Sequence, residues 1–276
     1  MSIRIRRTDR IRTAGVVVLA VSAAVALAAC STPAAHVPAS SAPSTPTAST
    51  LSGSITVFAA ASLKTTFTEL AAEFEKANPD VDVALNFAGS SDLVTQITEG
   101  APVDVFASAD EKNMAKLTDA GLVDAAAPVD FASNVLEIAV PPTNPAGVTG
   151  FADLAGPEVK AVVCAPQVPC GSATVAVEQA TGVTLTPVSE ESSVTDVLGK
   201  VTSGEADAGL VYVTDVIAAG DAVTGITFPE SSEAVNTYPI APVTASENPD
   251  VAQAFVDFIT GDVGQYVLAA AGFGKP

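Results

Sequence analysis

Basic residues and histidine are scarce in this chain of 276 residues. All five arginines lie between Arg4 and Arg12, the other basic residues are seven lysines, and His36 is the single histidine. With a net charge of −19 and no basic patch, the chain lacks the electrostatic footprint of a nucleic-acid-binding protein, so nucleic acid is excluded as a partner. A secreted thiol or serine hydrolase is also not expected, because no histidine other than His36 is available as a base and a nucleophile-elbow motif is missing. We therefore predict that the protein is not an enzyme.

Cysteine is equally rare, with only Cys30, Cys164 and Cys170. Their spacing contains no C-x-x-C, which argues against a thioredoxin-like active site. Zinc is not expected either, since no further cysteine or histidine can complete a tetrahedral site. In an oxidising compartment, the pair Cys164 and Cys170 favours a disulfide.

The N-terminus predicts export. A basic segment that includes Arg4 and Arg12 precedes a short apolar stretch from Ala14 to Ala29, as in a signal peptide spanning residues 1–29. The stretch ends in L-A-A-C, which resembles a bacterial lipobox in which Cys30 becomes the lipidated first residue. We therefore expect a protein anchored by lipid to the extracytoplasmic face of the cell membrane. Removing residues 1–29, with a net charge of +4, leaves a mature chain of −23.

The residues after Cys30 predict a tether followed by a folded region. Of the 22 residues at positions 31–52, 14 are Pro, Ser or Thr, a composition that favours a flexible linker, placed at residues 30–53 with the lipidated cysteine. The 223 residues from Ser54 to Pro276 are long enough for one large domain or two lobes. Apolar strand patterns such as Ile55–Phe58 alternate with segments of helical periodicity, which predicts an α/β fold.

Four expected strand-to-helix junctions carry small or hydroxylated residues. They are Ala61-Ser62-Leu63, Gly89-Ser90-Ser91, Pro169-Cys170-Gly171 and Ser192-Ser193-Val194. Each alone reads as an ordinary helix cap. Together, several helix N-termini that face one point supply free backbone N–H groups and partial positive charge, which can bind an anion without Lys or Arg. In sheets of this class, ligands bind at the carboxyl ends of the strands, where these junctions lie.

The amino-acid sequences around these junctions resemble those of the molybdate-binding proteins of ABC transporters. The matching segments are I-T-V-F-A-A-A-S-L (55–63), N-F-A-G-S-S-D-L (86–93), Q-I-T-E-G-A-P-V-D-V-F-A-S-A-D (96–110), V-P-C-G (168–171), S-S-V-T-D-V-L (192–198) and G-E-A-D-A-G-L-V-Y-V-T-D (204–215). The similarity extends over essentially the whole region from Ser54 to Gly274.

The resemblance implies a two-lobed type II periplasmic-binding-protein fold, each lobe a mixed sheet flanked by helices. The expected lobes are residues 54–133 with 238–276, and residues 134–237, with chain crossings near Ser133-Asn134 and Asn236–Tyr238. It also implies a monomeric solute-binding protein without a cofactor, which captures molybdate or tungstate and delivers it to an ABC permease with its ATPase. Molybdenum would be present only as the bound oxyanion, without direct protein ligands.

The family's ligand contacts map onto five residues. Ser62, Ser90 and Tyr212 match residues that bind the oxyanion through hydroxyl groups. Cys170 and Val194 match residues that bind it through backbone N–H groups, although Cys170 stands where the family commonly has alanine.

Such a donor-only site suits molybdate, a deprotonated dianion whose oxygens only accept hydrogen bonds. Protonated phosphate would leave its own proton without an acceptor, at a cost of roughly 1–3 kcal/mol. Sulfate presents the same hydrogen-bonding pattern but is smaller, so a binding protein for sulfate stays an alternative. A surface lipoprotein without a transport role is a second alternative.

Overall fold

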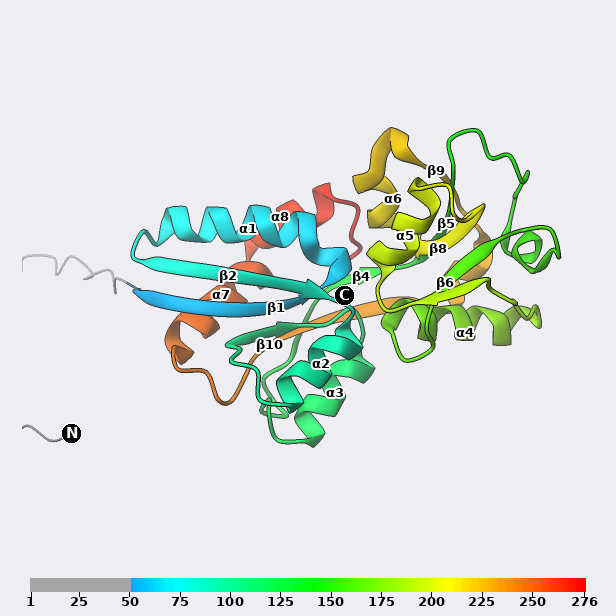
Figure 1. The fold of residues 1–276 in the computed structure, drawn as a ribbon. Coiled ribbons are helices and arrows are strands. Elements are labelled where there is room, and N and C mark those ends of the chain that lie inside the picture. The colour runs from blue at the N-terminus through cyan, green and yellow to red at the C-terminus, as the bar shows by residue number, and fades with distance from the viewer. Residues whose placement is uncertain (1–50) are drawn as a thin grey trace, which may run out of the picture. The chain divides into compact units, whose positions relative to one another are not determined.

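Two five-stranded mixed sheets form the centre of residues 51–276, the part of the chain that the computed structural model describes (Figure 1). The predicted signal peptide, Cys30 and most of the predicted linker lie outside the described residues. The first strand begins at Gly53, the last residue assigned to the linker. The two sheets and their flanking helices confirm the predicted fold class.

Sheet A has the strand order β2-β1-β3-β10-β4. Its strands are β1 (Gly53–Ala60), β2 (Val81–Ala88), β3 (Val105–Ala107), β4 (Val129–Asn134) and β10 (Asn236–Pro242). Strands β1, β2 and β3 are parallel, whereas β10 runs antiparallel to both of its neighbours. The sheet is therefore mixed because a strand from the far end of the chain is inserted into it.

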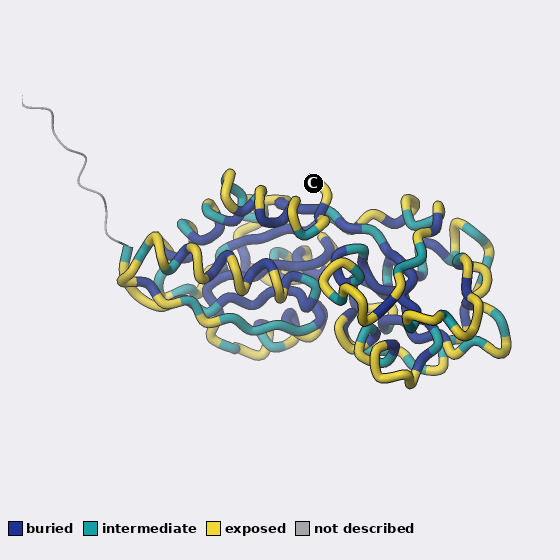
Figure 2. The backbone as a smooth tube through the Cα atoms, turned by 90° about the horizontal axis from the view of Figure 1, so that it is seen from above, coloured by how far each residue is buried: buried dark blue, intermediate teal, exposed yellow. Residues whose placement is uncertain are grey.

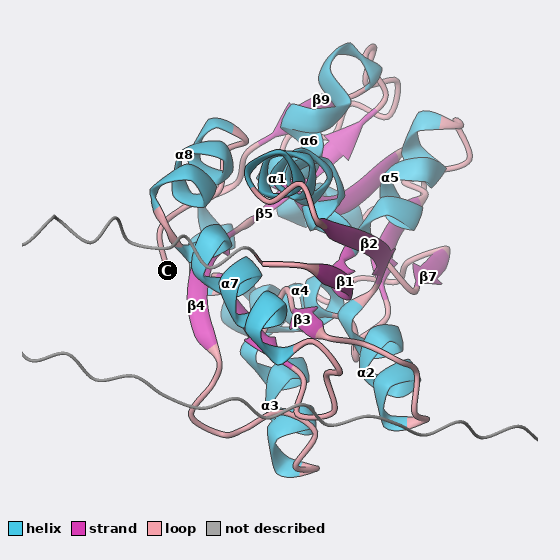
Figure 3. Ribbon diagram, turned by 90° about the vertical axis from the view of Figure 1, so that its left-hand side faces the viewer, coloured by secondary structure: helices cyan, strands magenta, loops and turns pink. Residues whose placement is uncertain are grey.

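Helices cover both faces of sheet A (Figure 3). They are α1 (Lys64–Ala77), α2 (Ser90–Thr98), α3 (Glu111–Asp119), α7 (Pro249–Thr260) and α8 (Asp262–Ala270). One apolar cluster joins α1, α7 and α8 to the sheet, and a second joins α2 and α3 to the opposite face. The central strands β1, β3 and β10 are buried along most of their length, whereas the edge strand β2 is mostly half-buried (Figure 2).

Sheet B has the strand order β7-β6-β8-β5-β9. Its strands are β5 (Leu136–Val140), β6 (Ala161–Cys164), β7 (Ser189–Glu191), β8 (Ala208–Tyr212) and β9 (Thr224–Ile226). Its helices are α4 (Pro169–Thr181), α5 (Val194–Thr202) and α6 (Val213–Ala219), with short 3-10 turns at Phe151–Ala155, Gly220–Ala222 and Pro229–Glu233. A single apolar cluster fills this half of the structure.

The chain passes between the sheets twice. Strand β4 ends at Asn134 in sheet A, and β5 begins two residues later in sheet B. The return occurs before β10, which begins at Asn236. Asn134 also bridges the two halves, because its side-chain amide donates to the Thr214 hydroxyl of α6 at 2.7 Å.

Within residues 51–276, no helix is long and apolar enough to cross a membrane. The same region contains no cluster of three or more His, Cys, Asp or Glu side chains that could hold a metal ion.

Candidate functional site

All five residues predicted to contact the ligand line one small pocket between the two halves of the structure. The lining residues are Ala60, Ala61, Ser62, Gly89, Ser90, Ala109, Val168, Pro169, Cys170, Val194 and Tyr212. The register of sheet A places the ends of β1 and β2 side by side, with Ala60 opposite Ala88, so the junctions that follow both strands reach the same place.

The pocket has a cavity volume of about 10 Å³. This is far smaller than the roughly 300–1,000 Å³ of typical sites for organic ligands. None of its lining residues is charged. Recognition here must therefore come from hydroxyl groups and from the backbone.

Ser62 does not cap a helix, contrary to the sequence-based expectation. It lies inside a 3-10 turn, η1 (Ala61–Leu63), which leads directly into α1. Its Oγ instead lies 3.0 Å from the hydroxyl oxygen of Tyr238. The side chain is thus free of the local backbone and available to a ligand.

Ser90 is also not a side-chain cap. It is the first residue of α2, with Gly89 at the N-cap position. Its buried Oγ accepts the backbone N–H of Ala109 at 3.0 Å. Because that bond uses a lone pair and not the proton, the Ser90 hydroxyl can still donate to an oxyanion.

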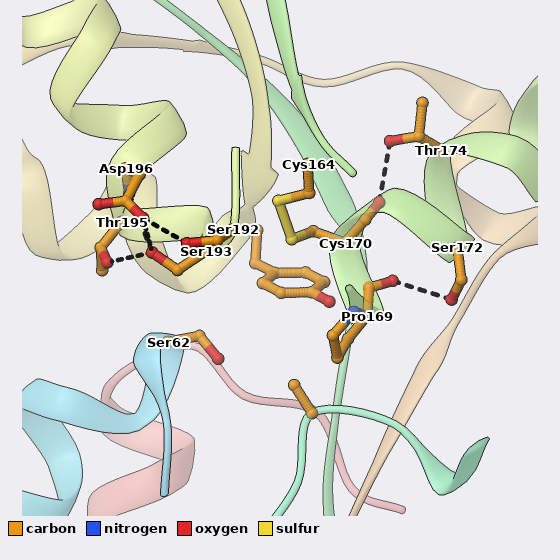
Figure 4. The surroundings of a disulfide bond; sticks show 12 residues. Ser62, Cys164, Pro169, Cys170, Ser172, Thr174, Ser192, Ser193, Thr195 and Asp196 are labelled. Carbon is orange, nitrogen blue, oxygen red and sulfur yellow. Dashed lines mark hydrogen bonds between the residues drawn. A yellow bond between two sulfur atoms is a disulfide. The ribbon is translucent and has the colours of Figure 1, made fainter. Parts of the chain in front are cut away.

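Cys170 lies at the start of α4, where a disulfide joins it to Cys164 at the end of β6 (Figure 4). Pro169 occupies the first position of the helix, and the first helical bond runs from the Ser172 N–H to the Val168 carbonyl at 2.8 Å. The N–H groups of Cys170 and Gly171 therefore have no partner within the helix. The disulfide links this helix start to the strand beneath it.

Val194 begins α5, and Ser193 caps this helix as predicted. The Ser193 hydroxyl accepts the Asp196 N–H at 3.2 Å and donates to the Asp196 carboxylate at 2.7 Å (Figure 4). The N–H of Val194 precedes these bonds and has no partner within the helix. Helix starts from both halves of the structure thus contribute donors to the same pocket.

Tyr212 ends β8, and its side chain is only 1% exposed. Its hydroxyl group has no hydrogen-bond partner among residues 51–276. Burial raises the pKa of this phenol well above 10, and the nearby phenol of Tyr238 and carboxyl of Asp110 raise it further. The hydroxyl therefore keeps its proton and is an unused donor facing a pocket of donors, an arrangement that a buried acceptor would satisfy.

The two halves approach each other closely at Gly89. A Cβ atom at this position would overlap the backbone carbonyl oxygen of Ser192, which lies beside the start of α5. In this structure, the backbones on the two sides of the pocket are therefore in contact.

Three residues that were not predicted to belong to the site support it. Tyr238 bonds to Ser62, Asn134 bridges the halves, and Asp215 accepts the backbone N–H of Tyr212 at 3.0 Å. Asp215 lies in the matching segment 204–215, three residues after Tyr212. Tyr238 and Asn134 lie in strands whose sequences contain no motif that points to a site. Strand β10 contains Pro239, a residue that argues against a central strand.

Replacing Asp215 with asparagine should stabilise the protein above pH 7. Burial raises the pKa of Asp215 from 3.8 to about 7, although the bond from the Tyr212 N–H lowers it. Because the folded-state pKa is the higher one, this group costs stability as the pH rises through that window. Asparagine keeps an acceptor for the N–H without the charge. At pH 8 we expect a gain of about 2–4 kcal/mol in the free energy of unfolding, since tenfold in ionisation equals about 1.4 kcal/mol.

Denaturant unfolding at pH 4.5 and pH 8 would test this prediction. The stabilisation by Asp215→Asn should be large at pH 8 and small at pH 4.5, where the wild-type carboxyl group is largely protonated. The exposed Asp221 offers a control, because Asp221→Asn removes the same charge without relieving burial. Equal effects of Asp215→Asn at both pH values would contradict the prediction.

Comparison with known proteins places the chain among binding proteins. The model of the bacterial extracellular solute-binding protein family matches residues 55–274. The molybdate-binding protein ModA of Mycobacterium tuberculosis is 50% identical over 223 residues, covering 81% of this chain and 85% of that protein. The molybdate-binding protein ModA of Escherichia coli is 34% identical over 230 residues, covering 80% and 89%.

The periplasmic molybdate-binding protein of Azotobacter vinelandii has the same fold, with a TM-score of 0.70, 24% identity, and coverage of 80% of this chain and 99% of that one. The chain therefore belongs to the bacterial extracellular solute-binding protein family.

Proposed function

We propose that this protein captures molybdate, and also tungstate, outside the cytoplasm and delivers it to an ABC importer. The observation that carries the proposal is the buried hydroxyl group of Tyr212, which has no partner among residues 51–276 and lies at a pocket without charged lining residues. The relatives that are molybdate-binding proteins support the choice of ligand.

In the proposed complex, the oxyanion accepts hydrogen bonds from the hydroxyls of Ser62, Ser90 and Tyr212 and from the N–H groups of Cys170 and Val194. The N-termini of α2, α4 and α5 add partial positive charge at the same point. A tetrahedral oxyanion without a proton finds only donors here, so each of its oxygens can be satisfied. Protonated phosphate would meet no matching acceptor, and this difference gives selectivity.

Transport requires a mechanism for capture and release, and we propose hinged closure of two lobes. The lobes are residues 54–133 with 238–276, and residues 134–237, connected by the crossings near Asn134 and Asn236. Ligand donors come from both lobes, so binding favours the closed form. That form would dock, as a monomer, on a permease driven by an ATPase. No catalytic step is part of this role.

Calorimetric titration of the mature protein with four oxyanions tests the proposal. We expect one molybdate per chain, comparable binding of tungstate, weaker binding of sulfate and no competition by phosphate. A ligand-induced rise in melting temperature should accompany the binding. Phosphate binding as tight as that of molybdate would overturn the donor-only site, and tighter sulfate binding would identify a sulfate transporter instead.

We also propose that Cys30 carries a lipid that anchors the protein to the membrane. The expected consequence is that Cys30→Ser releases the protein into the medium or blocks its processing, because a buried acyl chain contributes roughly 0.8 kcal/mol per methylene. Cell fractionation with detection of the protein by antibody measures this. Cys164→Ser leaves the lipobox intact and serves as the control. A Cys30→Ser variant that is processed and still membrane-bound would contradict the anchor.

A further inference from the structure

A pair of hydroxyl groups connects the pocket to the interior of the protein. Ser62 lines the pocket, and its Oγ lies 3.0 Å from the hydroxyl oxygen of Tyr238, which is not among the lining residues. Tyr238 is 0% exposed. Either hydroxyl could donate in this bond, and which one does so decides what Ser62 can offer to a ligand.

The chemistry of the ligand selects the direction of the bond. A serine hydroxyl has one proton, and an oxyanion without protons can only accept. If Ser62 donates to the oxyanion, the proton in the bond to Tyr238 must come from the tyrosine. Burial raises the pKa of Tyr238, so its hydroxyl group keeps that proton.

Packing holds the Tyr238 ring, and with it the hydroxyl oxygen, in a set position. Its ring packs edge-on against Phe131, Phe273 and Tyr212, with ring centroids 6.3, 5.5 and 6.1 Å away. The pairing of β10 with β4 shifts register between Tyr238 and Pro239, an irregularity of the kind that re-aims side chains in sheets. The tyrosine hydroxyl therefore occupies a set position next to Ser62.

Ser90 shows the same principle with a different donor. The Ala109 N–H donates to its Oγ, and this bond leaves the Ser90 proton available to the pocket. Both serines thus have a buried hydrogen-bonding group on one side and the pocket on the other. For Ser90, the donor on the protein side directs the hydroxyl proton toward the pocket.

We propose that Tyr238 is a positioning residue of the oxyanion site, which donates to Ser62 and so presents the serine proton to the ligand. This inference rests on the proposed function. The consequence is selectivity for molybdate over phosphate. When Tyr238 donates to the Ser62 oxygen, the Ser62 hydroxyl group acts as a donor toward the pocket. Without Tyr238, the Ser62 hydroxyl can rotate and offer a lone pair to the proton of phosphate.

The three tyrosines of the chain allow a matched experiment. Tyr238→Phe removes one oxygen and keeps the ring, and Tyr266→Phe makes the same change at a side chain that is 77% exposed. By calorimetry, Tyr238→Phe should weaken molybdate binding by about 2- to 10-fold, the range of a single hydrogen bond. Phosphate, which should not compete with molybdate in the wild type, should begin to compete in Tyr238→Phe, so that the preference for molybdate narrows. Tyr266→Phe should change neither.

A double-mutant cycle with Ser62→Ala separates positioning from a general structural effect. If Tyr238 acts through Ser62, adding Tyr238→Phe to Ser62→Ala should cause no further loss of affinity. Equal losses in both backgrounds, or an unchanged molybdate-to-phosphate preference, would overturn the inference. If the wild-type protein binds no molybdate at all, the proposed function fails instead, so the two failures are distinguishable.

A measurement on the unaltered protein covers the case in which Tyr238→Phe does not fold. In NMR spectra of the protein labelled at tyrosine Cζ, the buried Tyr238 hydroxyl proton should be observed as slowly exchanging when molybdate is bound. A nuclear Overhauser effect between this proton and the β-protons of Ser62 would show that the tyrosine proton points toward the serine. A bound state in which Ser62 donates to the Tyr238 oxygen would contradict the inference.

Discussion

Replacing Gly89 with alanine should weaken molybdate binding by about a hundredfold while leaving both halves of the protein folded. The backbone at Gly89 has φ −59° and ψ 140°, which alanine adopts without strain. The added Cβ would overlap the Ser192 carbonyl oxygen on the other side of the pocket. Because separation of the lobes removes this contact, the substitution opposes closure and not folding. A hundredfold loss corresponds to about 2.7 kcal/mol, within the usual cost of overpacking.

Calorimetry gives the affinity of Gly89→Ala, and thermal unfolding without ligand gives its stability. Gly199→Ala is the matched control, because a Cβ at that helical position meets no atom within 4 Å. Small-angle scattering adds a direct readout, since Gly89→Ala should not contract on addition of molybdate as the wild type should. Wild-type affinity in Gly89→Ala would show that binding does not require this approach of the two backbones.

Tyr212→Phe should lower the affinity for molybdate by about ten- to a hundredfold, since a hydrogen bond to a charged ligand contributes roughly 1.5–3 kcal/mol. The ligand-free protein should at the same time become equally or more stable. The Tyr212 hydroxyl is buried without a partner among residues 51–276, and removing such a group relieves a cost of desolvation. Opposite effects on affinity and stability are typical of a group retained for function.

Calorimetric titration and melting temperature on the same preparations test both parts of this prediction. Tyr266→Phe again serves as the control, because it removes a hydroxyl group from an exposed side chain. Val194→Ala adds a control within the pocket, because it retains the backbone N–H and should change affinity little. A Tyr212→Phe variant with unchanged affinity, or one that is strongly destabilised, would show that this hydroxyl serves the fold and not the ligand.

The predicted architecture depended on patterns that persist over several residues. The apolar pattern of Ile55–Phe58, which lies in β1, and the helical periodicity of the segments between the strands are of this kind. The short strands β7 and β9 contain three residues each, too few for a period. Strand β10 was hidden by Pro239, which is tolerated there because the register shifts beside it.

The helix starts were predicted at the right places, but the roles of their serines were only partly correct. Ser193 caps α5 through a contact within four residues, and local sequence determines such contacts. Ser62 and Ser90 bond instead to Tyr238 and to the Ala109 N–H, which are 176 and 19 positions away. A partner that distant is chosen by the packing of the sheet, so no local pattern indicates it.

The amino-acid sequence by itself predicted the class of site: the shortage of basic residues and the small, hydroxylated helix starts favour recognition by neutral donors. Only the tertiary structure decided which donors meet, because strand ends far apart in the chain come together through sheet register and the crossings at Asn134 and Asn236. It also places the Tyr238 hydroxyl group within hydrogen-bonding distance of Ser62, and the backbone of Gly89 against that of Ser192. Burial and distance between remote segments depend on the whole fold, whereas capping, periodicity and charge depend on neighbouring residues.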